Sequence, residues 1–191
     1  MTTVSILGTG NMGPAIASIV TKGGNTAELL GSSDTDRAVT GDIVILAVPY
    51  PAISAVLAER ADQLAGKIVV DLTNPLNFET FDSLTVPADS SAAAEIQAAL
   101  PSSRVLKAFN TNFAATLAEG TIGGQPTTVL IAGNDADAKS ELSTIIAAAG
   151  LNAIDAGSLS RARELEAMGF LQITLAAGEK IAWTGGFAVQ A

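Results

Sequence analysis

The stretch that most constrains the fold lies near the N-terminus, where "TVSILGTGNMGPAIA" joins an apolar run to an alanine-rich segment. Gly8, Gly10 and Gly13 stand there in the spacing G-x-G-x-x-G. The first glycine of such a unit permits a tight turn, the second lets the backbone approach a pyrophosphate, and the third lets a helix pack closely on the strand. A strand before the glycines and a helix after them are the context that a dinucleotide-binding turn requires. Pro14 falls in the first helical turn, where proline is tolerated. We predict a phosphate-binding turn; a tight turn without a ligand is the alternative.

Short apolar runs alternate with alanine-rich amphipathic segments along most of the 191-residue chain. The apolar spacing predicts strands at 3–7, 26–30, 43–48, 67–72, 104–109, 127–132 and 151–155. It predicts helices at about 11–22, 51–64, 90–100, 135–149 and 159–183. This alternation is typical of a mostly parallel sheet with helices on both faces. We therefore predict an α/β, doubly wound Rossmann dinucleotide-binding fold, in a single domain over residues 1–191 with a C-terminal helical segment at about 159–191.

Polar residues, glycine and proline follow the predicted strands, in "PYP", "TNPLN", "NTNFA", "GND" and "AGS". Ligands of open α/β sheets bind outside the carboxyl ends of the strands, so we expect these loops to form a site. Only ten residues separate Gly31 from Asp42. A crossover between parallel strands usually needs about a dozen residues with a helix. The second helix is therefore expected to be cut to a turn or two, near the adenosine end of a bound dinucleotide.

The composition excludes several classes of function. The chain has neither cysteine nor histidine, which rules out disulfides, thiolate nucleophiles, His-based triads and Cys/His zinc sites, and we expect no metal. A net charge of −9 without any block of Lys or Arg argues against a nucleic-acid partner. No basic leader precedes the first apolar run, and no run reaches the ~18 residues of a membrane helix. We expect a cytoplasmic protein without a membrane partner.

The end of the second predicted strand bears on the choice between NAD and NADP. An acidic residue about 20 residues after the glycines would bind the ribose of NAD. Glu28 has roughly that offset but falls inside the strand. The strand end carries Ser32 and Ser33, whose hydroxyls can bond a 2′-phosphate, and Arg37 could add charge. The acidic residues Asp34 and Asp36 argue against a bound 2′-phosphate. We favour NADP(H) because the strand end itself has no acid.

Several motifs occur in the order found in a known family. "GTGNMG", "AVPY", "VVDLTNPLN", "SAAAEIQAALPSSRVLKAFNTNFA" and "DAGSLSRARELE" together span nearly the whole chain. In these motifs the sequence resembles the NADPH-dependent deazaflavin (factor 420) reductases, and also the cytosolic domain of the six-transmembrane metalloreductases. The resemblance implies a hydride-transfer oxidoreductase that uses NADP(H), with a flavin or deazaflavin as co-substrate, and a homodimer.

The resemblance also implies a set of site residues. Asn110 lies in the loop that lines the hydride-transfer site of the family, and Tyr50 lies beside the nicotinamide, so these two are the predicted catalytic residues. The family usually has Ser-Arg where this chain has Ser32-Ser33, and archaeal members have His where this chain has Asn110. With the glycine turn and the strand-end residues, the predicted cofactor-binding residues are Gly8, Thr9, Gly10, Asn11, Met12, Gly13, Ser32, Ser33, Arg37, Val48, Pro49, Tyr50, Asn74, Pro75, Thr111 and Ala114.

Three other features have a structural and a functional interpretation. Lys107 lies in an apolar strand and could be a catalytic acid, but we favour a strand-edge lysine that extends to solvent. The charged residues at helical spacing after residue 160 favour a solvated or interface face; they are Arg161, Arg163, Glu164 and Glu166. Trp183 and Phe187 are interpreted as packing anchors, which could also close over a flat ring.

Two further functions compete with hydride transfer to a flavin-like acceptor. One is an NADPH-dependent reductase of a small carbonyl or imine, which would need a proton donor near the substrate. The other is a non-catalytic sensor that binds NADP(H) and reports the NADPH/NADP ratio through a partner. Reduction of a flat acceptor is the favoured function, because the cofactors carry the difficult chemistry and the chain offers no histidine for acid–base work.

Overall fold

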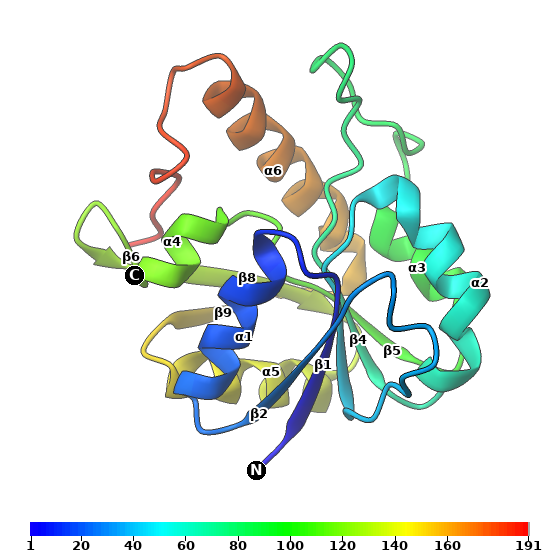
Figure 1. Ribbon diagram of the computed structural model, residues 1–191. Coiled ribbons are helices and arrows are strands. Elements are labelled where there is room, and N and C mark those ends of the chain that lie inside the picture. Colours follow the sequence, from blue (N-terminus) through cyan, green and yellow to red (C-terminus); the bar gives the residue numbers. More distant parts are fainter. Residues whose placement is uncertain (191) are drawn as a thin grey trace.

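The computed structural model describes residues 1–190 and contains a seven-stranded sheet flanked by helices (Figure 1). The strand order is β2-β1-β3-β4-β5-β8-β9. These strands are β1 (Thr3–Leu7), β2 (Thr26–Leu30), β3 (Ile43–Leu46), β4 (Ile68–Asp71), β5 (Arg104–Lys107), β8 (Thr128–Gly133) and β9 (Asn152–Gly157). A separate small hairpin pairs β6 (Thr121–Ile122) with β7 (Gln125–Pro126). The helices are α1 (Met12–Lys22), α2 (Ile53–Leu64), α3 (Ala92–Ala99), α4 (Ala114–Glu119), α5 (Ala136–Ala148) and α6 (Ala162–Ala177). The predicted α/β Rossmann architecture is confirmed.

The central strands are buried on both faces, which explains why they read as continuous apolar runs. Successive side chains of a strand point to opposite faces. Ile45 therefore packs in a core with α1, α4 and α5, whereas its neighbour Leu46 packs in a second core with α2 and α3. These two cores hold the strands in place, so that their carboxyl ends share one edge of the sheet.

The order in which the strands are added to the sheet reverses at β1. Both β2 and β3 pair with β1 in parallel, one on each side, so the chain leaves β1 toward one side and later crosses to the other. The loops after β1 and β3 therefore diverge at the carboxyl edge of the sheet. In open α/β sheets this reversal leaves a crevice in which ligands bind.

The last two strands correct one expectation. β8 is antiparallel to β5, so the residues after β8 and β9, in "GND" and "AGS", do not join the loops after β1, β3, β4 and β5. The physical reason is the connection between β5 and β8, in which α4 has only six residues. Six helical residues span roughly 9 Å, too little to return the chain to the far edge of the sheet. The amino end of β8 lies on the side of the site instead, where Asn112 donates to the Thr128 carbonyl.

The link between β2 and β3 contains no helix, whereas a helix of a turn or two was expected. It is anchored from α2 by Arg60, which is buried and donates to the carbonyls of Asp34 and Arg37 at 2.6 and 2.7 Å. The link is therefore short and exposed but fixed at its middle.

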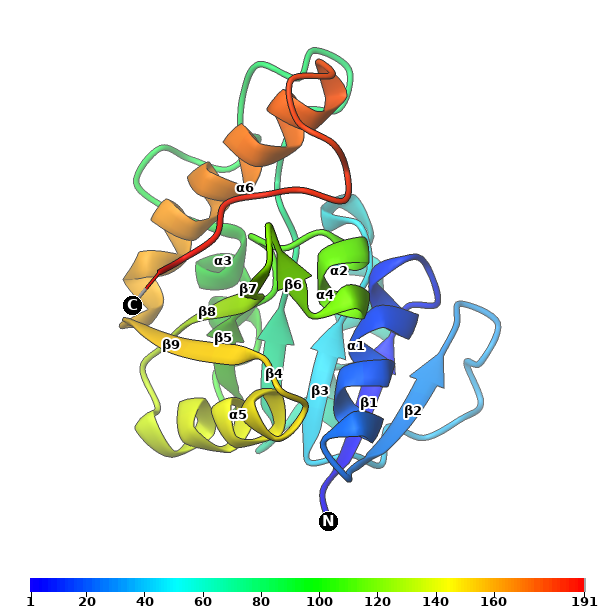
Figure 2. The same ribbon diagram turned by 90° about the vertical axis from the view of Figure 1, so that its left-hand side faces the viewer.

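The C-terminal segment also differs from the prediction. The helix expected at 159–183 is a 3₁₀ turn at Leu159–Arg161 followed by α6, which ends at Ala177. Gly178 follows, and residues 178–190 run back past α6 and α4 as an extended tail (Figure 2). Within residues 1–190, no helix is both long and apolar enough to cross a membrane.

Candidate active site

The glycine turn is shaped by two glycines and left open by the third. Gly8 has a φ of +124°, and a Cβ there would lie 2.1 Å from the Ala47 carbonyl oxygen. A Cβ on Gly13 would lie 2.1 Å from the Gly8 carbonyl oxygen. A Cβ on Gly10 would meet nothing within 4 Å. Gly8 and Gly13 are thus required by the packing of β1, β3 and α1, whereas Gly10 faces open space that a ligand can occupy.

The helix that follows this turn has a free N-terminus. α1 begins at Met12, and Asn11 before it makes no side-chain capping bond. No acidic residue lies in the first turn. The first N–H groups of a helix lack partners within the helix and carry a partial positive charge, so they bind anions. The residues at this turn therefore fit a pyrophosphate.

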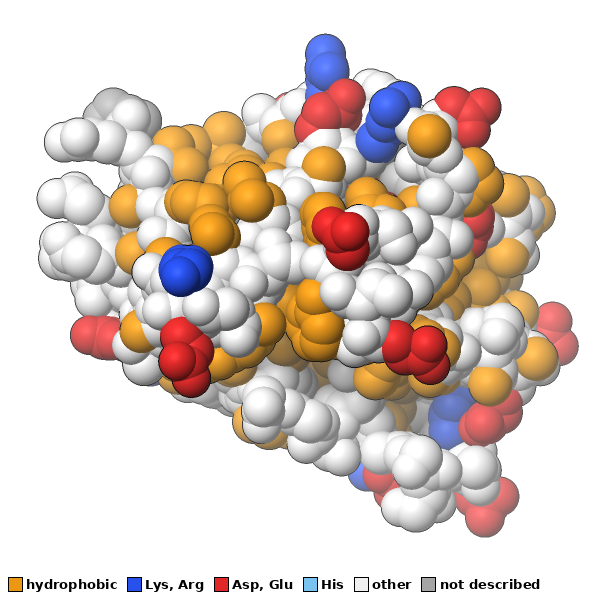
Figure 3. Space-filling view, turned by 90° about the horizontal axis from the view of Figure 1, so that it is seen from above, with side chains coloured by type: hydrophobic (Ala, Val, Ile, Leu, Met, Phe, Trp, Pro, Cys, Tyr) orange, Lys and Arg blue, Asp and Glu red, His pale blue; other side chains and the backbone are white. Residues whose placement is uncertain are grey.

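A large cavity begins at this turn and extends past the ends of β3, β4 and β5 to α4, α6 and the tail. Its volume is about 1130 Å³, and none of the described residues that line it is charged. Seen from above, this side of the molecule exposes hydrophobic side chains with scattered charged ones (Figure 3). The predicted residues that line the cavity are Thr9, Gly10, Asn11, Met12, Val48, Pro49, Tyr50, Asn74, Asn110 and Ala114. Those that do not are Gly8, Gly13, Ser32, Ser33, Arg37, Pro75 and Thr111.

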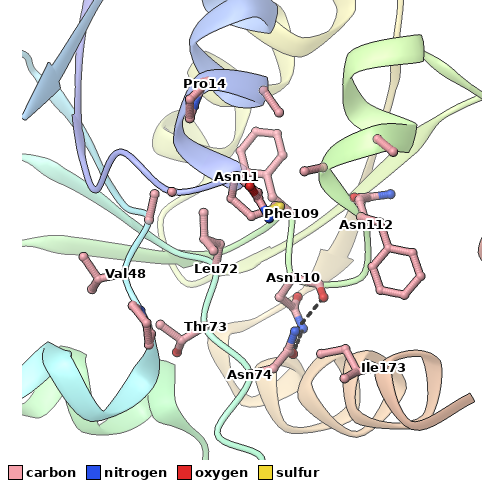
Figure 4. A pocket seen from close by; sticks show the side chains of 18 of the residues that line it. Asn11, Pro14, Val48, Leu72, Thr73, Asn74, Phe109, Asn110, Asn112 and Ile173 are labelled. Atoms are coloured by element: carbon pink, nitrogen blue, oxygen red, sulfur yellow. Dashed lines mark hydrogen bonds between the residues drawn. The ribbon is translucent and has the colours of Figure 1, made fainter. Parts of the chain in front are cut away.

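Asn74 and Asn110 face each other across the floor of the cavity (Figure 4). The Asn110 amide donates to Asn74 Oδ1 at 2.9 Å and to the Leu165 carbonyl at 2.8 Å. The Asn74 amide donates to the Asn110 carbonyl at 2.9 Å. Asn110 Oδ1 is buried and has no hydrogen-bond partner within residues 1–190. Buried polar atoms are almost always paired. This oxygen is covered by protein atoms, so the Asn74–Asn110 pair offers a ligand an uncharged surface held in place by hydrogen bonds.

The backbone before this pair is strained. Phe109 is buried beneath the cavity and has a φ of +65°. A bulky residue in the left-handed region is uncommon, and such strain gathers at functional sites. It turns the chain sharply at the end of β5, so that Asn110 faces Asn74 across the end of β4.

Tyr50, the other predicted catalytic residue, forms a hydrogen bond within the protein. The Tyr50 hydroxyl donates to Glu95 Oε2 at 2.5 Å. Burial, together with the Glu95 carboxylate, raises the pKa of Tyr50 above its ordinary value. The phenol therefore stays neutral, and its ring lines the cavity while its proton points to α3.

Lys107 corrects the prediction of a solvent-reaching lysine. It is fully buried, and its Nζ lies 2.7 Å from Asp71 Oδ2, 2.9 Å from Glu166 Oε1 and 2.5 Å from the Thr73 carbonyl oxygen. Glu166, which we expected on a solvated or interface face, is also fully buried and accepts from the first N–H groups of α3. Burial raises the pKa of Glu166, against the lowering effect of Lys107. This network joins β4, β5, α3 and α6 directly below Asn74.

The adenosine end is exposed. Ser32 and Ser33 lie on the surface, and Arg37 donates to the Leu29 carbonyl and pairs with Asp34 at 3.5 Å. The N–H of Gly31 and then Arg37 lower the pKa of Asp34. Glu28 points away from this end, because it accepts from the hydroxyls of Ser5 and Thr40. Within residues 1–190, no group of three or more acidic side chains could hold a metal ion.

Comparison with known proteins identifies the family. An F420-dependent NADP reductase of Methanocaldococcus jannaschii is 34% identical over 173 residues, which cover 87% of this chain and 76% of the relative. This chain belongs to the F420-dependent NADP reductase family. The family model described as "NADP oxidoreductase coenzyme F420-dependent" matches residues 25–75. The resemblance predicted from the sequence motifs is confirmed.

Two other proteins extend this comparison. A candidate F420-dependent NADP reductase of Arthrobacter sp. FB24 has a solved structure that matches with a TM-score of 0.85, 26% identity and 100% coverage of both chains. The metalloreductase STEAP3 of Rattus norvegicus is 36% identical over 133 residues, which cover 70% of this chain but only 26% of that relative. The solved reductase structure therefore matches over the full length of this chain, and the metalloreductase only over a part.

Proposed function

We propose that this protein is an NADP(H)-dependent oxidoreductase that passes a hydride between nicotinamide and a flat acceptor of the deazaflavin F420 type. Its membership of the F420-dependent NADP reductase family supports this function. The observation that carries it is a single cavity of about 1130 Å³, which leads from the free N-terminus of α1 to the Asn74–Asn110 pair. Pockets for one small ligand measure roughly 300–1,000 Å³. This cavity has room for two ring systems in contact.

The two cofactors would supply the redox chemistry, and the chain would hold them together. Bringing two rings into reacting distance removes much of the entropic barrier of a bimolecular step. In this proposal the backbone around Gly10 and Met12 holds the pyrophosphate. Val48 and Pro49 lie beside the nicotinamide, and the Asn74–Asn110 pair lies against its ring.

Reduction of the acceptor also takes up one proton. We propose that the Tyr50 hydroxyl, which donates to Glu95 in this structure, turns to the acceptor, gives up its proton there and takes another from solvent. Tyr50→Phe would then slow turnover and leave nucleotide binding unchanged. Parallel titrations of NADPH and steady-state rates measure the two effects separately, and equal rates in both proteins would contradict the relay.

The proposed function is tested by anaerobic oxidation of NADPH in the presence of F420, followed through the absorbance of the oxidised deazaflavin. Asn110→Ala removes the side-chain bond to Asn74, and should lower kcat/KM by about 10–100-fold. Asn134→Ala is the matched control, because Asn134 follows β8 and does not line the cavity. NADPH binding without any reduction of F420, FMN or FAD would contradict the function and favour a sensor.

We also propose that the protein works in the cytoplasm as a homodimer that uses the outer face of α6. Leu171 on this helix is 51% exposed, and the partner subunit would cover it in the proposed dimer. Sedimentation should show a dimer for the native protein and a monomer for Leu171→Lys. A monomeric native protein would contradict this assembly.

A further inference from the structure

We infer that Trp183 on the C-terminal tail forms the aromatic wall of the acceptor subsite and stacks on the flat ring of the hydride acceptor. This inference rests on the proposed function and specifies which side of the cavity the acceptor takes. The ligand class is a planar heteroaromatic ring system, such as a deazaflavin or a flavin.

Trp183 lines the cavity, and packing against the rest of the protein covers only part of its side chain. Its ring centroid lies 4.9 Å from that of Phe113, with 53° between the ring planes. Phe113 is buried at the start of α4, whereas 53% of Trp183 stays exposed. A large indole held at the edge of a cavity with half its surface free offers a stacking face to a ligand.

The tail that carries Trp183 is fastened to the floor of the site. The Phe187 N–H donates to Gln172 Oε1 at 3.1 Å, and the other end of the same amide, Gln172 Nε2, donates to the Thr111 carbonyl at 3.1 Å. Gln172 is only 2% exposed, so this connection is buried. One side chain of α6 thus holds both the tail and the loop that follows Asn110. The position of Trp183 is set by the same element that sets the position of the proposed hydride-transfer site.

The place of Trp183 assigns it to the acceptor rather than to the nucleotide. The glycine turn and Val48 lie on one side of the Asn74–Asn110 pair, and Ile173 of α6 lies on the other side (Figure 4). Trp183 packs on Phe113, and Phe113 follows Asn112, which lies on the same side of the pair as Ile173 (Figure 4). The free N-terminus of α1, which fits a phosphate, lies at the other end of the cavity, so the region beside Trp183 suits an uncharged ring.

The chain contains one tryptophan, so a change in tryptophan fluorescence reports directly on ligand binding at Trp183. FMN or F420 added to the protein loaded with NADP⁺, where no turnover occurs, should quench the fluorescence of Trp183. Trp183→Ala should raise the KM for the acceptor about tenfold or more, since stacking on an aromatic side chain has effects of this size. The KM for NADPH should stay within about twofold, and Trp183→Phe should recover part of the loss.

Phe187→Ala is the matched control. Phe187 lies on the same tail, is also exposed and does not line the cavity, and its backbone N–H remains bonded to Gln172 in the variant. Thermal unfolding of all the variants checks that the fold is kept. An unchanged acceptor KM in Trp183→Ala would overturn the inference, as would an equal rise in the KM for NADPH. If the native protein reduces no acceptor, the proposed function fails, while quenching by FMN or F420 would still support the subsite and its absence would overturn it.

Discussion

The two ends of the proposed dinucleotide site are built very differently. At the ring end, Asn74 and Asn110 bond to each other above a buried network centred on Lys107. At the adenosine end, Ser32 and Ser33 lie exposed on a link that contains no helix. The buried end permits one arrangement of side chains, whereas the exposed end can change with little cost to the fold. We infer that the geometry of hydride transfer is fixed by the core, and that the nucleotide preference is set separately on the surface.

The largest expected effect is on the stability of the ring end. Lys107→Met would leave the carboxylates of Asp71 and Glu166 buried without a cation. Removing one partner of a buried ion pair costs about 3–5 kcal/mol. Urea unfolding should show a loss of this size in the free energy of unfolding.

A surface ion pair with the same distance between nitrogen and oxygen provides the control. Lys139 Nζ lies 2.7 Å from Asp155, as Lys107 Nζ does from Asp71, but Asp155 is 59% exposed. Lys139→Met should cost under about 1 kcal/mol. Lys139 lowers the pKa of Asp155, so the small contribution of this pair is present above the ordinary carboxyl pKa and is lost as the pH falls through the lowered one. Equal losses in the two variants would show that the ring end is no more constrained than the surface.

The next effect separates a binding glycine from a packing glycine. Gly10→Ala meets no protein atom, so it should unfold like the native protein but bind NADPH at least about tenfold more weakly, because the new methyl group blocks the approach of the pyrophosphate. Gly13→Ala should lower the unfolding temperature, since its methyl group would collide with the Gly8 carbonyl. Calorimetry of both variants with and without NADPH measures the two effects. Normal NADPH affinity in Gly10→Ala would exclude the glycine turn as the phosphate site.

The smallest expected effect concerns the adenosine end. Ser33→Arg adds a guanidinium where a 2′-phosphate would lie, and should raise the affinity for NADPH by about three- to tenfold without a gain for NADH. The gain is modest because the position is exposed and salt screens the charge. Ser140→Arg adds the same charge on α5, on an exposed surface that does not line the cavity, and should change neither affinity. An equal gain for both nucleotides would mean that Ser33 does not face the 2′-position.

Local patterns were sufficient to predict the elements that build the nucleotide end of the fold. The bounds of β1 and β2 agree with the expected 3–7 and 26–30, because both strands are bounded by glycine or polar residues. The helix expected to reach residue 183 ends at Ala177, because the apolar spacing continues into a tail that packs without being helical. α4 and the β6–β7 hairpin were missed, since elements of six and two residues carry too little periodicity to detect.

The buried network could not be predicted from local patterns. Asp71, the partner of Lys107 in β4, lies 36 residues before it in the sequence. Glu166, the second partner, lies on helix α6. Only the sheet register, which pairs Asp71 with Lys107, brings these charges together. A lysine in an otherwise apolar strand, with an aspartate at the end of the neighbouring strand, was the one available signal. It becomes meaningful once the two strands are known to be adjacent.

Direct transfer between two rings in one cavity is tested most directly by isotope labelling. NADPH that carries deuterium at both C4 positions would be mixed anaerobically with F420 and the native protein, and the reduced deazaflavin would be analysed by mass spectrometry. Direct transfer predicts one carbon-bound deuterium in the reduced deazaflavin. Reduced deazaflavin without deuterium, or NADPH that binds and is never oxidised, would contradict the account.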